Sequence, residues 1–550
     1  MQIATAWVKP PLQIGGLDHL AVQAPCINIY SRLIPGITNV TDRARYYSFY
    51  PWLIWAFDQA GIRAFDDEFI ELFRRADCLF TLIAERHAVV QGDDDERHAA
   101  AMVGSNTLAE LARSLGESNT IRLSDYSHRQ TAKQRYFKNN LGGLGQYYIG
   151  VLRELNVLDG DSRNGIKYTR QIGQPVAERM DAGVDRAQFM DIVRSDMVTS
   201  AQLAAIESFC PCFLPTQTQE LEILEDLFFV RGVFSDEDAL PRRRSLQAII
   251  SLADQLSENG LLLSEGTFRA CTYTGHLPDG NPWTLPDRLH GNQGRWAIYS
   301  RNELLSVAVQ GLFFALLDAY AESKRRFRTG RELVRWALST PEVRGTLETL
   351  DGERSFAEQV AQARDWLPDL ADWQDPLHEV SLAETVVENT SGRCSPQRRE
   401  AIILAASRIL IALAARAPND ATPYATIEFQ ADYFRNYPIN LRSFQRNCST
   451  DWAALPTRDV LAWLLEHWGL ELHLRVALRK LRGQSQSTFR IRPSDQGFEV
   501  IEPPAPAHTR PRFRQSLMIL KDLGLLADDG TGTLRSTERS AALMELSDAS

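Results

Sequence analysis

One short pattern of leucines occurs twice in this chain, and it constrains the fold more than any other feature. Each copy has three leucines at intervals of three residues: Leu152, Leu155 and Leu158 in the first, and Leu520, Leu523 and Leu526 in the second. The offset of 368 residues that aligns the leucines also aligns Thr169 with Thr537. Leucines at positions i and i+3 lie on one face of a helix. The repeat therefore predicts two copies of one small structural unit.

The residues that follow the leucines predict how each unit continues. Asn156 and Gly524 are residue types that adopt the left-handed conformation in which helices end. Turn-rich segments follow at 159–165 and 528–532, and short strands at 166–169 and 533–535 come next, as in β-hairpins. Helix, strand, hairpin, strand and helix is the order of a winged helix-turn-helix. The alternative is an ordinary helix followed by a β-hairpin.

Helical periodicity dominates the rest of the chain, so the expected fold class is mainly α and multidomain, with minor β structure in the winged-helix-like hairpins. At about 150 residues per domain, a chain of 550 residues holds about three to four domains. The pattern divides into five segments: an N-terminal helical domain at 1–118 with an aromatic segment, a winged-helix-like module at 119–184, a central helical domain at 185–373 with a long ordered loop at 262–300, a helical linker domain at 374–454, and a C-terminal winged-helix-like domain at 455–550.

Composition narrows the classes of function. The net charge of −10 excludes a polyanion binder of the histone type, but a local basic face stays possible because salt screens surface fields beyond about 10 Å. The seven scattered cysteines do not form the framework of a secreted disulfide-rich protein. The apolar stretches at 304–321 and 401–415 contain polar or charged residues and are interpreted as buried core helices. We expect a cytoplasmic protein with no membrane partner.

Basic residues gather in three places. The expected DNA-contacting residues of the tail are Arg475, Arg479, Arg482, Arg490, Arg492, Arg510, Arg512 and Arg514, and those before the first leucine unit are Lys133, Arg135 and Lys138. Basic residues with interleaved aromatics suit phosphate contact and base stacking. The alternative is a solvated or protein-facing surface. A third run at 324–328, with Arg331, follows an apolar helix whose C-terminus itself favours cations.

An aromatic and basic segment near the N-terminus has two interpretations. Its candidate residues are Arg43, Arg45, Tyr46, Tyr47, Tyr50 and Trp52. In the functional interpretation the rings stack on a base or nucleotide and the arginines bind phosphate. In the structural one, a helix packs its rings into a core and the arginines pair with acids, which is the commoner role of an aromatic stripe. Pro51 is expected to kink or end this helix.

The same segment is similar in sequence to a segment found in other bacterial proteins. Residues 35–52, PGITNVTDRARYYSFYPW, resemble a segment of uncharacterised proteins encoded in bacterial phage-defence gene clusters, and residues 488–526 resemble another part of such proteins. The resemblance implies an accessory or sensing component of an antiviral defence system. It also implies protein partners encoded in the same gene cluster.

Familiar catalytic motifs are missing from the sequence. It has no phosphate-binding glycine loop, H-E-x-x-H motif or G-x-S-x-G elbow. Cys210-Pro-Cys212 is spaced too tightly for the usual zinc pair, even with Cys271 and His276 as further ligands, and the acids at 93–96 near His98 are typical of a solvated turn. We therefore expect no metal site and no cofactor, and name no catalytic residues.

The leading hypothesis is a non-enzymatic DNA-binding or scaffold subunit of a bacterial antiviral complex. One alternative is a metal-dependent nuclease, whose carboxylates would converge from distant parts of the chain. The other is a protein-only adaptor, whose basic faces would meet acidic partner surfaces.

Overall fold

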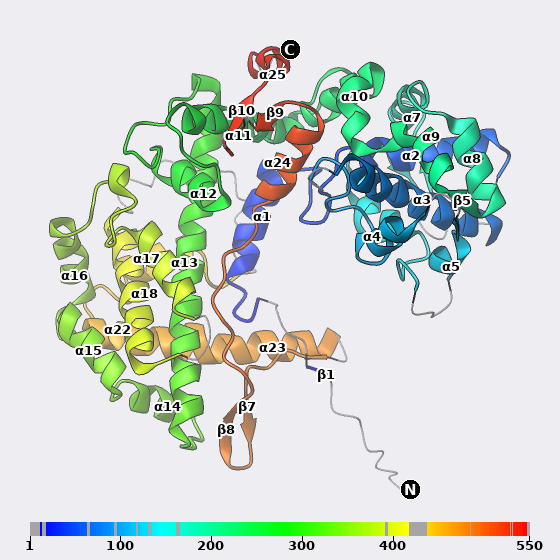
Figure 1. Ribbon diagram of the computed structural model, residues 1–550. Helices are drawn as coiled ribbons and strands as arrows, with labels where there is room; N and C mark the ends of the chain where they lie inside the picture. Colours follow the sequence, from blue (N-terminus) through cyan, green and yellow to red (C-terminus); the bar gives the residue numbers. More distant parts are fainter. Residues whose placement is uncertain are drawn as a thin grey trace, which may run out of the picture. The chain divides into compact units, whose positions relative to one another are not determined.

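The chain folds into two compact units, each assembled from segments that are distant in the sequence. The structure is a computed structural model that describes residues 12–13, 18–62, 67–92, 96–116, 119–129, 134–160, 165–390, 394–416, 437–483, 486–528, 530 and 532–546. Unit 1 comprises residues 1–30 and 266–509, and unit 2 comprises residues 31–265 and 510–550. The fold is mainly α with a few short hairpins, as predicted (Figure 1). The two units are discontinuous in sequence, whereas the five expected segments are consecutive; the unit boundary at 509/510 falls inside the expected segment 455–550.

Unit 1 is built around the long helix α13 (Asp287–Ser323), against which α17 (Glu379–Glu388) and α18 (Pro396–Arg416) pack (Figure 1). α13 is long and apolar enough to cross a membrane, but 78% of its most apolar window is buried within the structure. This burial is that of a core helix in a soluble protein. The predicted buried helices at 304–321 and 401–415 therefore lie in α13 and α18.

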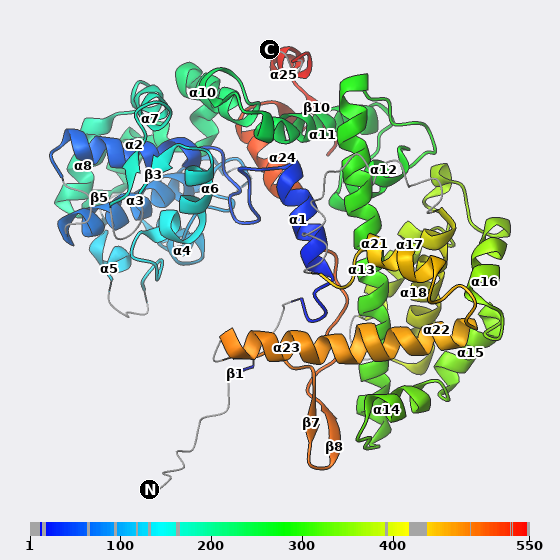
Figure 2. The ribbon, with the colours of Figure 1, turned by 180° about the vertical axis from the view of Figure 1, so that it is seen from behind.

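A continuous helical rod crosses unit 1 and leads into a hairpin (Figure 2). The rod consists of α22 (Thr457–Trp463), the π-helical stretch η9 (Leu464–Glu471) and α23 (Leu472–Gly483). Strand β6 (Gln486–Ser487) pairs in parallel with β1 (Leu12–Gln13), and β7 (Ile491–Ser494) pairs antiparallel with β8 (Gly497–Val500). The cross-strand register places Arg492 opposite Glu499.

The shorter elements of unit 1 surround this frame. They are α14 (Gly330–Ala337), α15 (Pro341–Leu350), α16 (Phe356–Gln362), η6 (Ala363–Asp365), η7 (Leu370–Asp372) and α21 (Leu441–Ser449). The unit boundaries fall within α1 (Gln23–Leu33) and at the first residue of α12 (Glu265–Thr274). The expected loop at 262–300 is much shorter in the structure, because α12 and the start of α13 occupy most of it.

Unit 2 has an aromatic core around α2 (Tyr46–Gln59), which is buried at every position from Tyr46 to Phe57. α7 (Gly173–Asp181) packs along α2, and α3 (Asp67–Gln91) contributes rings such as Phe80, which stacks on Phe49 at 3.9 Å between centroids. Pro51 lies inside α2 and the helix continues to Gln59, so the expected helix end at Pro51 is wrong.

The remaining elements of unit 2 complete this core. The helices are α4 (Ser105–Ser114), α5 (Ser124–Ser127), η1 (Leu144–Tyr148), α8 (Arg186–Ser195), α9 (Ser200–Ala205), η2 (Glu207–Phe209), η3 (Pro211–Thr216), α10 (Thr218–Phe228), η4 (Gly232–Phe234), η5 (Glu237–Ala239) and α11 (Leu240–Glu258). Strands β2 (Thr120–Arg122) and β5 (Met197–Thr199) pair antiparallel.

The repeated leucine unit has one local structure in both copies. The first copy is α6 (Ile149–Glu154), β3 (Leu158–Asp159), β4 (Lys167–Tyr168) and α7, and the second is α24 (Phe513–Asp522), β9 (Leu526–Asp528), β10 (Leu534–Ser536) and α25 (Glu538–Met544). The predicted order of helix, hairpin and helix is therefore confirmed twice.

Equivalent hydrogen bonds hold each copy together. The hydroxyl of Thr169 donates to the carbonyl of Asn156 at 2.6 Å, and that of Thr537 donates to the carbonyl of Gly524 at 2.7 Å. Asn156 and Gly524 both have positive φ, at 54° and 67°. The constant offset of 368 residues thus reflects the same helix end in both copies, followed by a threonine whose hydroxyl binds the carbonyl of the residue with positive φ.

Candidate nucleic-acid interface

Exposed cations concentrate from the end of α13 into α14 of unit 1, in a stretch that we call the basic segment (residues 324–335). Its cationic residues are Lys324, Arg325, Arg326, Arg328, Arg331 and Arg335, and all six are exposed. Glu332 is the only acid within this stretch of sequence. A chain with a net charge of −10 therefore carries a dense run of exposed positive charge at residues 324–335.

The basic segment is held by a buried framework. Lys324 has φ of 55° and ends α13. The N–H of Phe327 donates to the Tyr320 hydroxyl at 3.2 Å, and the carbonyl of Phe327 accepts from the N–H of Phe498 in the β7–β8 hairpin at 2.8 Å. The Phe327 ring packs against Tyr320 and Trp336. The aromatic residue is thus an anchor, and the cations on either side of it project to solvent.

Helix dipoles do not account for all of this charge. A helix C-terminus favours cations only within about one turn, which covers Lys324 and Arg325 but not the later residues. Arg331 lies in the first turn of α14, where the dipole disfavours a cation. Among the described residues, none forms an ion pair with Lys324, Arg325, Arg326 or Arg328, whereas Arg331 lies 3.9 Å from Glu466. These cations remain available to an external anion.

The predicted tail arginines are divided between the two units. Arg475 and Arg479 are exposed on α23, and the Arg475 side chain, 76% exposed, lies 3.6 Å from Glu471. Arg492 is exposed but pairs with Glu499 at 3.0 Å. In unit 2, Arg510 and Arg514 are exposed. The side chain of Arg482 lies outside the described residues.

Two tail arginines have structural roles, which corrects their assignment as phosphate contacts. Arg490 is 5% exposed, pairs with Glu502 at 2.8 Å and donates to His19 at 3.2 Å. Arg512 donates to the carbonyl of Ile34 at 2.8 Å and to the Ser31 hydroxyl at 2.9 Å. Their guanidinium groups are already bound within their own units and do not reach a phosphate without breaking these bonds.

The basic residues before the first leucine unit differ in exposure and in hydrogen bonding. Lys138 is exposed, and Arg135 donates to the carbonyl of Arg129 at 2.8 Å. Lys133 lies outside the described residues.

The aromatic segment is core, so its functional interpretation does not fit the structure. Tyr46, Tyr47, Tyr50 and Trp52 are each 0% exposed, and no base can stack on them from solvent. The two arginines are buried in pairs with acids: Arg43 binds Asp522 at 2.8 Å, and Arg45 binds Glu220 at 2.8 Å. This is the structural interpretation of the segment.

The leucine-bearing helix of the second copy does not act as a DNA recognition helix. α24 is buried along most of its length, and only Arg514 is fully exposed. A helix lying in the major groove must present a solvent-facing side to the bases. The resemblance to a winged helix is therefore one of element order, and α24 does not supply direct base readout.

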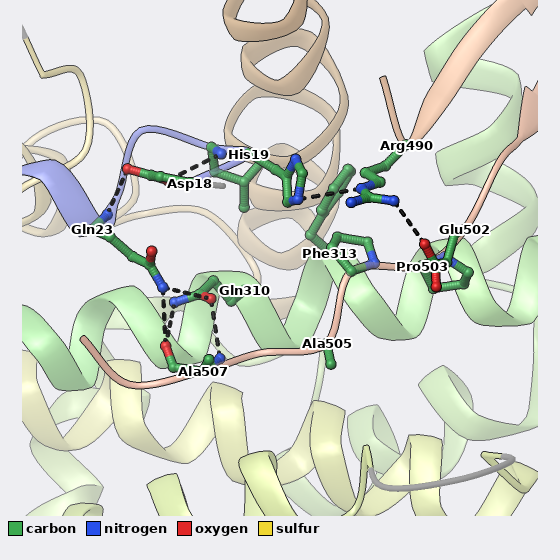
Figure 3. A pocket seen from close by; sticks show the side chains of 12 residues that line it. Asp18, His19, Gln23, Gln310, Phe313, Arg490, Glu502, Pro503, Ala505 and Ala507 are labelled. Carbon is green, nitrogen blue, oxygen red and sulfur yellow. Dashed lines mark hydrogen bonds and ion pairs between the residues drawn. The ribbon is translucent and has the colours of Figure 1, made fainter. Parts of the chain in front are cut away.

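A polar pocket of about 390 Å³ lies in unit 1 between the segment that leads into α1, α13 and the segment 502–507 that follows β8. Figure 3 shows Arg490 between His19 and Glu502, and Gln23 and Gln310 bound to the backbone of Ala507. Asp18 accepts backbone N–H groups of α1, including that of Gln23 at 3.0 Å. Most polar groups of the pocket form hydrogen bonds or ion pairs with each other. The pocket therefore holds the start of α1, α13 and the segment after β8 together.

Metal-ligating side chains converge at one place among the described residues, in unit 2: His87, His98, Cys210 and Cys212. Their ligand atoms all lie within 4.8 Å of one another. The tight spacing of Cys210 and Cys212 had argued against a zinc pair, and the further ligands considered with them, Cys271 and His276, belong to unit 1. The four residues come from segments more than 100 positions apart, and only the folded chain brings them together.

Comparisons with protein-family models, curated proteins and solved structures give no match to this chain.

Proposed function

We propose that this protein is a non-enzymatic nucleic-acid-binding subunit that contacts phosphates through the basic segment of unit 1. The observation that carries the proposal is the set of six exposed cations within residues 324–335, of which only Arg331 forms an ion pair with a described residue. Arg475 and Arg479 of α23 are further exposed cations of the same unit. DNA is the expected partner.

The physical basis is release of counterions from the nucleic acid. Each lysine or arginine that neutralises a phosphate displaces condensed cations, and this supplies most of non-specific affinity. The basic segment offers a row of such residues on a fixed backbone, because Phe327 is anchored on both sides. Since phosphates carry no sequence information, this contact orients the nucleic acid without reading its bases.

The cellular setting of the proposal rests on the resemblance of residues 35–52. We infer from it an accessory or sensing component of a bacterial antiviral complex, with protein partners encoded in the same gene cluster, and expect the protein to act in the cytoplasm. In that setting the basic segment brings the complex onto DNA.

A charge-reversal series tests the contact. Arg325→Glu, Arg326→Glu and Arg328→Glu together should weaken binding to a short duplex DNA at least about 100-fold in a gel-shift assay at low salt, because attraction to three phosphates becomes repulsion. The matched control reverses Arg344, Arg364 and Arg442, which are exposed arginines of unit 1 outside the basic segment. The control has the same net charge and should bind within a few-fold of wild type.

The same assay distinguishes the alternatives. Equal loss in both triple variants would contradict the proposal, since net charge alone would then explain binding. Wild-type protein that ignores DNA at physiological salt would identify a protein-only adaptor instead. Magnesium-dependent loss of plasmid DNA would identify a nuclease.

A further inference from the structure

Four metal-ligating side chains meet in the interior of unit 2. His87 lies near the end of α3, and His98 lies in the turns that follow α3. Cys210 lies between η2 and η3, and Cys212, which is half-buried, lies in the first turn of η3. Cys210 is 0% exposed, His98 is 1% exposed and His87 is 8% exposed. Buried cysteine and histidine side chains gathered in this way are the usual ligands of zinc.

Two of the distances between ligand atoms match a tetrahedral ion. The Cys210 sulfur lies 3.6 Å from Nδ1 of His98, and the Cys212 sulfur lies 3.3 Å from Nδ1 of His87. Zinc bound to sulfur at about 2.3 Å and to nitrogen at about 2.0 Å in a tetrahedron separates such ligand atoms by about 3.5 Å. Each cysteine is thus paired with one histidine at the separation that a shared ion requires.

The charges also suit a buried zinc ion. Two thiolates neutralise Zn²⁺, so the filled site has no net charge to bury. Nε2 of His87 lies 3.2 Å from the Gln91 side-chain amide, within hydrogen-bond distance, and 3.8 Å from Oε2 of Glu207, so polar groups outside the site hold the ring whose Nδ1 faces Cys212.

The buried arginines of the aromatic segment hold the backbone that carries the ligands. Arg43 donates to the carbonyls of Glu96, Arg97 and Ala100, on both sides of His98. Arg45 donates to the carbonyls of Ser208 and Cys210. Two neighbouring residues of one segment therefore fix both ligand-bearing loops, which makes them positioning residues for the site.

We propose that His87, His98, Cys210 and Cys212 form a structural zinc site that joins the end of α3 to the η2–η3 segment of unit 2. Four protein ligands close the coordination sphere, so the ion stabilises the fold and does not activate water.

Metal analysis of the full-length chain tests this site. Protein purified from zinc-supplemented cells should contain about one zinc ion per chain. After removal of zinc, added Co²⁺ should give the visible bands of a tetrahedral ion together with a thiolate-to-cobalt charge-transfer band in the near ultraviolet. Removing zinc from wild-type protein with a chelator should lower the melting temperature, and added zinc should restore it.

Zinc binding by cysteine variants tests whether the ion is bound at this cluster. Cys212→Ser should weaken zinc binding by more than about 100-fold, beyond the loss typical of an outer-shell change. Cys271→Ser, a buried cysteine of unit 1, is the matched control and should retain the zinc. If Cys212→Ser does not fold, the wild-type cobalt spectrum still decides the question. Wild-type protein without zinc and without a thiolate-to-cobalt band, or with a Cys210–Cys212 disulfide by mass, would overturn the proposal.

Discussion

At the scale of single residues, two buried histidines of unit 1 link stability to pH. Burial lowers the pKa of His19 to about 3 and that of His473 to about 4. Both are neutral in the folded chain at physiological pH, and the hydrogen bonds of His19 to Arg490 and of His473 to the backbone N–H of Arg490 use that neutral form. An unfolded chain binds a proton at each histidine near pH 6.5.

This difference predicts acid destabilisation with a definite sign. As pH falls from about 6.5 towards about 3, His19 binds a proton in the unfolded state but stays neutral in the folded state. The free energy of unfolding therefore falls with pH over this range. His19→Gln keeps an acceptor for Arg490 and removes the titrating group. Its unfolding free energy in urea should therefore fall less steeply than that of wild type between pH 6.5 and pH 4. Parallel curves for the two proteins would contradict this account.

The sequence predicts which side chains of the aromatic segment are buried, but it does not predict which acidic residues pair with the buried arginines. The aromatic stripe at 46–57 is buried, as its composition indicates. The partners of its arginines were not predictable, because Asp522 lies 479 residues from Arg43 and Glu220 lies 175 residues from Arg45. Basic composition alone likewise did not separate exposed Arg479 from buried Arg490.

At the scale of elements, the leucine unit shows which parts of the fold depend only on residues close together in the sequence. The helix stop, the hairpin and the closing threonine all depend on contacts between residues close in sequence, and all were predictable. The proposed zinc-ligand cluster depends on two segments, 87–98 and 210–212, that only the tertiary fold brings together, so the spacing of its residues in the sequence carried no usable signal. The surrounding packing also decided that α24 is buried.

Gly524 tests the helix stop directly. Its φ of 67° costs a residue with a side chain about 1 kcal/mol or more, and a Cβ would lie 3.4 Å from Pro215 without a severe clash. Gly524→Ala should therefore lower the free energy of unfolding by about 1–2 kcal/mol in urea denaturation.

Gly150 in the first copy is the matched control. It is an exposed residue of α6 with open space around its Cβ position, so Gly150→Ala should raise stability by about 0.5–1 kcal/mol. Equal effects of the two substitutions would show that the left-handed conformation at Gly524 is not what ends the helix.

At the scale of the whole molecule, charge is distributed very unevenly. The chain as a whole is acidic, yet six exposed cations occupy residues 324–335, and unit 1 also carries exposed Arg475 and Arg479 on α23. The sequence indicated a basic tail, and the structure divides that tail between two units and buries part of it. In the sequence, the end of a helix suffices to explain the cations at 324–328, and only the fold shows that they are exposed.

The salt dependence of DNA binding tests the central claim most directly. The logarithm of the association constant falls linearly with the logarithm of salt concentration, with a slope of about −0.9 for each neutralised phosphate. Replacing Arg325, Arg326 and Arg328 together by glutamine should make this slope shallower by about 3, whereas the same change at Arg344, Arg364 and Arg442 should leave it as in wild type. A slope that is the same in all three proteins would show that the basic segment does not touch the phosphates.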